Sequence, residues 1–403
     1  MTWLDGQIRA GNNASFTNHG FFDDAGSGGQ FNSAYGGTWT FINPAGGTYN
    51  KTGGATTFAS GVALQNAGHV NVTLGSLLLQ GGGNLAGGTI TAAAGATVDL
   101  AGSFNSPGVV TFAGAGDIRM TAGTFATGTT FEGPLNWVAG NFNGTGTTIF
   151  GATSVISITS ANLHDFNQRA LVNEGVFNWT DGQIRAGNGA SFTNTTVFND
   201  TASSQFNSAY GGTWTFTNAP GGTYRRSGSG ITTATSGVSF SNAGRLQLDH
   251  GTLQLNSSLG LQSSSELAYT LSGAATDGGY GLLSVSTALA LSGMLQITFG
   301  AGFENSVTAI DTFTLLSASS LSGSFANVAN GGRLVTSDGL GSFQVNYGAG
   351  SIFTANQVVL SGFAAVPEPS TWAPLLLGGA IVALGARRRR AQVRSAARPG
   401  AAS

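Results

Sequence analysis

Short stretches of alternating apolar and polar residues recur along most of the chain. Examples are "HVNVTL" (69–74), "ATVDL" (96–100), "VVTF" (109–112) and "GTLQL" (251–255). Alternation over four to six residues is typical of β-strands with one buried face. The pattern therefore predicts an all-β protein built from many short strands.

A second pattern sets the spacing of these strands. An apolar residue, any residue and an asparagine recur together, usually with a glycine shortly afterwards, and consecutive copies lie 21 to 25 residues apart. The pairs are Phe16/Asn18, Phe41/Asn43, Leu64/Asn66, Leu171/Asn173, Phe192/Asn194, Phe216/Asn218 and Phe240/Asn242. This period predicts one coil of a right-handed parallel β-solenoid, and an antiparallel sandwich of short strands is the alternative.

Stacked coils place equivalent residues about 4.8 Å apart. We therefore expect Phe, Leu and Val to form interior ladders, and Asn and Gly to turn the corners. The asparagine amides are expected to bond from coil to coil. About a dozen coils would give a rod roughly 55–60 Å long.

A longer block is duplicated. "TWLDGQIRAGNNASFTN" (2–18) returns as "NWTDGQIRAGNGASFTN" (178–194), and "QFNSAYGGTWTF" (30–41) returns unchanged at 205–216. We place the duplicated block at 2–83 and 178–258, within a solenoid covering 1–258. Such self-similarity is the signature of a repeat architecture.

The rhythm changes over 259–365, where we expect hairpins in a β-rich C-terminal cap domain. The strand "IDTFTLL" (310–316) resembles the terminal segment of bacterial β-helical adhesins and autotransporter passenger proteins. A cap has a physical reason, because an open solenoid end exposes unpaired backbone and apolar ladders.

Composition narrows the class. The chain has 403 residues, of which 65 are Gly, 8 % are charged and 41 % are hydrophobic. The hydrophobic content argues against disorder, the competing reading of a glycine-rich chain. No Cys is present, which excludes disulfides and thiolate metal sites.

The basic residues gather at the end of the chain. Six of the 15 follow residue 386, which leaves 9 basic against 17 acidic residues before that point. This balance argues against a nucleic-acid partner, which would need a basic face.

The apolar run Trp372–Ala386 predicts a single C-terminal transmembrane helix, short for a span but free of charge. The anchoring side chains are Trp372, Leu375, Leu376, Leu377, Ile381, Val382 and Leu384. The stop-transfer cluster is Arg387, Arg388, Arg389 and Arg390, which would hold the C-terminus in the cytoplasm. A buried core helix is the alternative, and 392–403 is expected to be a disordered basic tail.

Pro367, Glu368 and Pro369, followed by an apolar run and an arginine cluster at the chain end, resemble the PEP-CTERM sorting signal. We place this segment at 366–391. The same element is also catalogued as an ice-binding protein C-terminal domain, a label that does not imply ice binding. The resemblance implies recognition of the Pro-Glu-Pro motif by an exosortase, a membrane-embedded cysteine transpeptidase.

That family belongs to Gram-negative bacteria that make exopolysaccharide. The implied partners are therefore the exosortase, membrane lipid at the tail, and exopolysaccharide as a further candidate. The implied location is the inner membrane before processing, and the cell surface or exterior afterwards. No signal peptide is visible, and Met1 falls inside a repeat, so we expect the natural start to lie upstream.

An enzyme is the remote alternative, since some β-solenoids are polysaccharide lyases or hydrolases. The candidate pairs are Asp5 with Arg9, Asp181 with Arg185, and Asp23 with Asp24. Duplication indicates structural contacts instead, and we expect the pairs four residues apart to be surface ion pairs. In the second copy Asp23 becomes Asn199.

The four histidines, His19, His69, His164 and His250, lack the spacing of zinc ligands. His69 aligns with Arg245, so we expect it to face solvent. We predict no catalytic residue, metal or cofactor. The sequence thus favours an exported structural or adhesive β-solenoid sorted through its C-terminal tag, with a polysaccharide- or ice-binding solenoid as the alternative.

Overall fold

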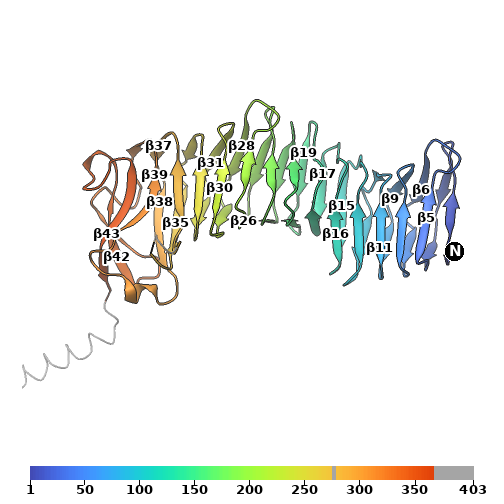
Figure 1. Cartoon of the computed structure of the whole chain (residues 1–403), viewed down its shortest axis with the longest axis horizontal. Helices are drawn as coiled ribbons and strands as arrows, with labels where there is room; N and C mark the ends of the chain where they lie inside the picture. The colour runs from blue at the N-terminus through green and yellow to red at the C-terminus, as the bar shows by residue number, and fades with distance from the viewer. Residues whose placement is uncertain (275–277, 367–403) are drawn as a thin grey trace, which may run out of the picture.

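The computed structural model describes residues 1–274 and 278–366. They form an elongated parallel β-solenoid of about 12 turns with almost no helix. Figure 1 shows the rod with the N-terminus at one end and strands β42 and β43 at the other, and with a bend near β15 to β19. The predicted solenoid, and not the sandwich, is confirmed. Its right-handed winding stays a prediction.

Two long sheets run along the rod. Sheet A contains 13 strands: β1 Thr2–Trp3, β4 Phe21–Asp24, β7 Thr48–Lys51, β10 His69–Val72, β13 Thr89–Ala92, β15 Gly108–Ala113, β17 Thr129–Glu132, β19 Thr147–Phe150, β22 Ala170–Asn173, β25 Ser191–Asn194, β28 Trp214–Asn218, β31 Val238–Asn242 and β34 Leu259–Leu261. Sheet B contains 14 strands: β2 Gln7–Arg9, β5 Gly28–Asn32, β8 Ala55–Phe58, β11 Ser76–Leu79, β14 Thr97–Leu100, β16 Asp117–Met120, β18 Pro134–Trp137, β20 Val155–Ile158, β23 Val176–Trp179, β26 Val197–Asp200, β29 Thr223–Arg226, β32 Arg245–Leu248, β35 Glu266–Leu271 and β38 Met294–Phe299.

The third side of the rod is divided between two sheets. Sheet C contains β3 Ser15–Thr17, β6 Trp39–Asn43, β9 Val62–Asn66 and β12 Gly83–Asn84. Sheet D contains β21 Leu163–Asp165, β24 Gln183–Arg185, β27 Gln205–Asn207, β30 Ile231–Ala234, β33 Thr252–Leu255, β36 Leu282–Val285, β39 Phe313–Ser317, β43 Gln357–Ala365, β42 Gly341–Asn346 and β41 Arg333–Val335. Single-residue parallel bridges through Phe104, Phe125 and Asn141 join β12 to β21, so C and D are one side of the rod.

The interior consists of the predicted ladders. Phe216 stacks between Phe192 and Phe240, with ring centroids 5.3 and 4.7 Å away, and all three are buried. Inward apolar side chains alternate with outward polar ones along each strand, as the burial pattern of β28 illustrates. The core is therefore continuous along the rod.

Buried asparagines bond from coil to coil at the corners, which confirms that prediction. In the first copy Asn18 donates to Asn43 at 2.9 Å, and Asn43 donates to Asn66 at 2.7 Å. The second ladder begins at Asn173, just before the second copy, and continues through Asn194, Asn218 and Asn242, with amide contacts of 2.8, 2.8 and 2.7 Å. The corners also need glycine, since a Cβ on Gly68 would lie 2.2 Å from the carbonyl oxygen of Gly47.

The two copies of the duplicated block sit on different sides of the rod. The segment "SFT" forms β3 in sheet C in the first copy, but its equivalent forms β25 in sheet A in the second. The next strand moves likewise from sheet A (β4) to sheet B (β26). Between equivalent strands of the two copies, the chain therefore completes a whole number of turns and then advances by one further side of the rod.

The intervening coils are irregular on their third side, where only isolated bridges form. The buried Arg169 lies at the end of this irregular stretch. Its guanidinium donates to the carbonyl oxygens of Phe125, Ala126 and Asn143 at 3.0, 2.8 and 2.7 Å. Backbone groups that no regular strand satisfies are thus held by one side chain.

The solenoid continues beyond the predicted boundary at 259. β35 and β38 extend sheet B with parallel pairing, and β36 and β39 extend sheet D in the same way. A small sheet, β37 Ala288–Leu291 with β40 Ser320–Gly323, is also parallel. The predicted hairpins are therefore wrong for this stretch.

Antiparallel pairing begins only with β43, which pairs with β39 and with β42, and β42 in turn pairs with β41. Two 3-10 turns complete the described elements, Phe303–Ser306 and Gly348–Gly350. The sequence pattern could not separate the two kinds of pairing, because parallel and antiparallel strands share the same alternation of side chains.

Candidate functional site

The predicted sorting residues lie outside the described residues. This holds for Pro367, Glu368 and Pro369, for the anchoring side chains from Trp372 to Leu384, for the arginines 387–390 and for the tail 392–403. The last described strand, β43, ends at Ala365. The sorting segment therefore follows the final strand of the body directly. Within 1–274 and 278–366, no helix has the length and apolar character needed to cross a bilayer.

The predicted ion pairs four residues apart are wrong. Arg185 does not pair with Asp181 but with Asp165 on the preceding coil, where Nε lies 2.7 Å and Nη2 2.9 Å from the two carboxylate oxygens. The Asp181 carboxylate accepts from the amide of Gly182 instead. The hydrogen bond to the Asp165 carboxylate is also the main reason why the pKa of Arg185 is raised. In the first copy, Asp5 similarly accepts from the amide of Gly6.

Asp24, one of the candidate acids, belongs to a buried polar cluster. Tyr49 donates to it at 2.5 Å and Thr56 at 2.7 Å, and Lys51 Nζ lies 3.4 Å away. All four side chains are buried. Burial, with the adjacent carboxylate, raises the pKa of Tyr49 well above its ordinary value, so this hydroxyl keeps its proton and donates.

The second copy repeats the cluster around Asp200. Tyr224 donates at 2.6 Å, Thr232 at 3.1 Å, and Arg226 replaces the lysine with an N–O distance of 3.0 Å. Burial raises the pKa of Asp200 to about 6, whereas the Arg226 guanidinium favours the charged carboxylate.

These two clusters are closed to solvent, because the carboxylates and cations are fully buried in both copies. Neither carboxylate is exposed at the surface of the described body. The clusters act as structural contacts that satisfy one buried charge with another and with hydroxyls. Asp23, in contrast, faces outward and accepts a 2.8 Å hydrogen bond from Asn50.

The histidines are dispersed. His19 and His69 are exposed, which confirms the prediction for His69, and His250 is half-buried. His164 is buried against Trp137, with ring centroids 5.2 Å apart, and burial lowers its pKa. The described residues contain no group of three His, Cys, Asp or Glu side chains able to hold a metal ion.

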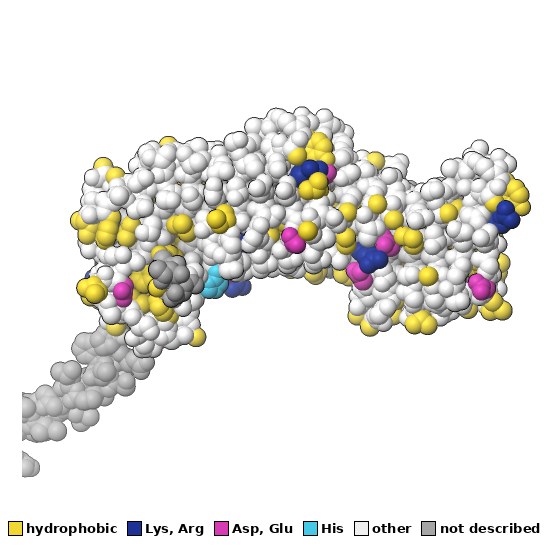
Figure 2. Space-filling view, in the orientation of Figure 1, with side chains coloured by type: hydrophobic (Ala, Val, Ile, Leu, Met, Phe, Trp, Pro, Cys, Tyr) yellow, Lys and Arg dark blue, Asp and Glu magenta, His cyan; other side chains and the backbone are white. Residues whose placement is uncertain are grey.

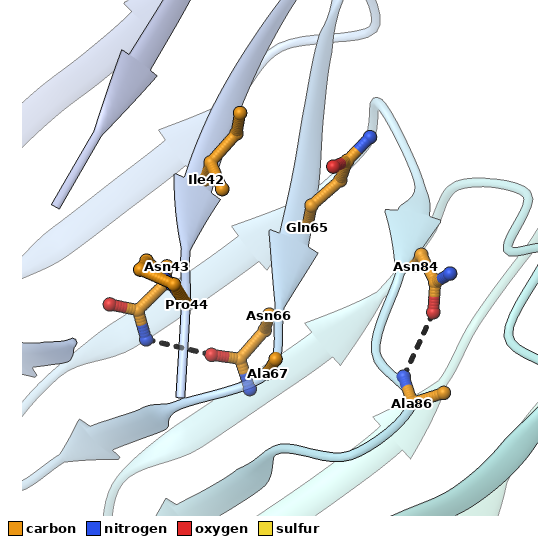
Figure 3. Close-up of a pocket in the computed structure, with 8 residues that line it drawn as sticks. All are labelled: Ile42, Asn43, Pro44, Gln65, Asn66, Ala67, Asn84 and Ala86. Atoms are coloured by element: carbon orange, nitrogen blue, oxygen red, sulfur yellow. Dashed lines mark hydrogen bonds between the residues drawn. The ribbon is translucent and has the colours of Figure 1, made fainter. Parts of the chain in front are cut away.

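A groove of about 250 Å³ follows the corner of sheet C across three coils. Figure 3 shows Ile42, Gln65 and Asn84 along it, with the Asn43–Asn66 bond beside them. Asn84 accepts from the amide of Ala86 at 2.9 Å, so its side-chain oxygen is already engaged. The groove is shallow and open, and it holds no ionisable side chain.

One surface array was missed from the sequence. The outward residues of β25, β28 and β31 all carry hydroxyls and lie in register: Ser191, Thr193, Thr215, Thr217, Ser239 and Ser241. The mixture of Ser and Thr hid the regularity, since a search for Thr-x-Thr finds only the central strand. The wider surface carries few charges, and Figure 2 shows them as isolated spots on the viewed face.

Comparison with known proteins identifies only the terminal segment. Residues 365–390 match the PEP-CTERM protein-sorting motif, one residue ahead of the predicted segment. No curated protein and no solved structure matches the chain. The motif implies exosortase-dependent sorting of an exported protein with a C-terminal membrane-anchoring tail.

Proposed function

We propose that this chain is a non-enzymatic structural or adhesive rod of the cell envelope or extracellular space. The observation that carries the proposal is the continuous solenoid, whose buried core extends from Trp3 to Phe363. A rod of stacked coils, each contacting its neighbours, is a stiff spacer. A sorting motif directly after its last strand suits a body that is displayed outside the cell.

The sorting steps follow from the tail. The apolar run 372–386 would halt in the inner membrane, with Arg387 to Arg390 on the cytoplasmic side. The exosortase would then act at Pro367–Pro369 and release the body or transfer it to the envelope. The prolines favour an extended backbone, which a processing enzyme can accept.

The antiparallel strands β41 to β43 fit the role of a cap. β43 pairs with β39, the last sheet D strand in the parallel stack, and β42 then covers the edge of β43. Sheet D then ends at β41, a strand of only three residues, and so short an edge discourages end-to-end association of sheets. The rod would therefore be displayed as a single unit from this end.

The test is the mass of the mature protein. The full chain, fused to a host signal peptide, would be expressed in a Gram-negative strain with and without its exosortase. We expect a product trimmed before Arg387 in the first strain, and the intact C-terminus in the second. Substituting Ala for Pro367, Glu368 and Pro369 should block trimming, whereas V366A, next to the motif, should not. A mature product that ends at Ser403 despite the exosortase contradicts the proposal.

The hydroxyl array on β25, β28 and β31 favours a second candidate, a solenoid that binds ice. Its six hydroxyls lie on a regular grid set by the strand spacing of about 4.8 Å. Replacing Thr215 and Thr217 with Val keeps the shape and removes two hydroxyls. Inhibition of ice recrystallisation by the wild type, and its loss in T215V/T217V, would support this function. No inhibition by the wild type would eliminate it.

A further inference from the structure

Each copy of the duplicated block displays the same surface feature, which we name the Arg–Tyr loop. It consists of Arg9 with Tyr35 in the first copy and of Arg185 with Tyr210 in the second. The guanidinium carbon lies 5.7 Å from the ring centroid in the first loop and 5.8 Å in the second. Tyr35 is 63 % exposed, whereas Tyr210 is half-buried and its hydroxyl donates to Asp165 at 2.5 Å. An aromatic ring stacked on arginine is thus presented twice by one rod.

The backbone around each ring is fixed by close contacts. The amide of Asn12 donates to the carbonyl of Gly36, and the amide of Asn188 donates to that of Gly211, both at 2.9 Å. A Cβ on Gly11 would lie 2.4 Å from the Gly36 oxygen, so only glycine permits this approach. The backbone that carries the ring is therefore held in place before any ligand arrives, which lowers the entropic cost of binding.

A ladder of amide side chains lies beside each ring. In the first copy Asn32 donates to Gln7 at 3.0 Å and to Gln30 at 3.2 Å, and these residues lie outward on β2 and β5. In the second copy Asn207 donates to Gln183 at 3.3 Å. In both copies the arginine is the register partner of the ladder asparagine, so ring, cation and amides form one continuous surface.

This combination of groups suits a sugar polymer. An aromatic face packs against the C–H face of a pyranose ring, and amides offer paired donors and acceptors to neighbouring hydroxyls. The Arg9 guanidinium adds donors for hydroxyls or carboxylates, whereas two nitrogens of Arg185 already donate to Asp165. A protein partner would favour a larger apolar patch, whereas the surroundings here are amides and glycines.

We propose that the two Arg–Tyr loops, each with its amide ladder, are two related binding sites for one polysaccharide chain. They are separated by eight turns and one further side of the solenoid, which corresponds to about 40 Å along the rod at the spacing between strands. A long polymer can reach both sites, so binding at one raises the effective concentration at the other. This goes beyond the structural role, and purified protein tests it without any sorting step.

The test is affinity electrophoresis of the purified full chain in native gels containing hydroxyethyl cellulose, dextran or alginate. We expect at least one polymer to retard the wild type. Y35A and Y210A should each weaken the apparent affinity for that polymer about tenfold, because one site loses the avidity of two. The double variant should migrate as it does in a gel without polymer.

Two further variants keep the result decisive. F21A removes another aromatic side chain, 67 % exposed on β4 outside the loops, and should bind as the wild type does. Y35F/Y210F keeps both rings and should retain binding while the hydroxyls are lost. Migration of the wild type unaffected by all three polymers overturns the proposal. Equal retardation of the wild type and Y35A/Y210A, with unchanged circular dichroism, overturns it too.

Discussion

The first and second copies of the duplicated block share their sequence but not their place on the rod. In the first copy the asparagine ladder of Asn18, Asn43 and Asn66 follows sheet C, and in the second the equivalent ladder follows sheet A. The interior clusters around Asp24 and Asp200 move with their copies. The contacts of a coil therefore depend on its own sequence and on the coils before and after it. They do not depend on the side of the rod on which the strand lies.

The copies also differ in two contacts. Lys51 in the first cluster is replaced by Arg226 in the second, which approaches its carboxylate more closely. Arg185 pairs with Asp165, whereas Arg9 forms no ion pair among the described residues. Matched substitutions in the two copies distinguish contacts that the block itself needs for folding from contacts made with residues outside the block.

The largest effect is expected from removing the buried carboxylates. D200A leaves the buried Arg226 without its counter-charge, and should lower the free energy of unfolding by about 3–5 kcal/mol. D24A should cost a similar amount through Lys51. N199A, which changes an outward residue on the same strand as Asp200, serves as the control. Guanidinium-induced unfolding measures all three, and a loss below 1 kcal/mol for D200A would refute a structural role for the cluster.

A smaller effect is expected from the asparagine ladder. Asn218 accepts from Asn194 and donates to Asn242 and to the carbonyl of Arg245, so N218A leaves several buried groups unpaired. We expect a loss of about 2 kcal/mol. Asn242 accepts from Asn218, but its next register partner is Leu261 and not an asparagine, so N242A should cost about half as much by the same reasoning. Equal losses would show that coil-to-coil continuity does not matter.

The smallest effect is expected at the surface arginines. R185A breaks a half-buried, two-bond ion pair and should cost about 1 kcal/mol, with less loss at high salt. R9A should leave stability unchanged. Thermal unfolding at low and high ionic strength gives the comparison. A larger loss for R9A than for R185A would contradict the assignment of Asp165 as the partner.

Much of the fold could be predicted because each short sequence pattern recurs in many coils. The spacing from Phe192 to Phe216 to Phe240 predicts both the coil length and the interior ladder, and the structure confirms both. The asparagines between apolar positions predicted the corner bonds for the same reason. A single strand of four residues would have carried none of this information.

Other features could not be predicted from the pattern. The partners of Asp24 lie 25 to 32 residues away on neighbouring coils, so their proximity depends on the register of the stack. The offset between the copies arises in coils without the asparagine motif. There the Arg169 guanidinium, and not regular strand pairing, donates hydrogen bonds to backbone carbonyl oxygens. The continuation of the solenoid beyond 259 was missed because alternation does not distinguish parallel from antiparallel neighbours.

The central structural claim is that the rod is one continuous parallel solenoid whose successive coils pair in register. Because the chain has no Cys, introduced pairs report proximity directly. Val172 and Thr193 are register partners on β22 and β25, within the range of a disulfide. An antiparallel sandwich would not hold these equivalent residues of successive coils in register, and Leu163 on β21, which belongs to sheet D, provides the negative control. Oxidation followed by mass spectrometry should give an intramolecular disulfide in V172C/T193C and none in L163C/T193C, and the reverse result would contradict the account.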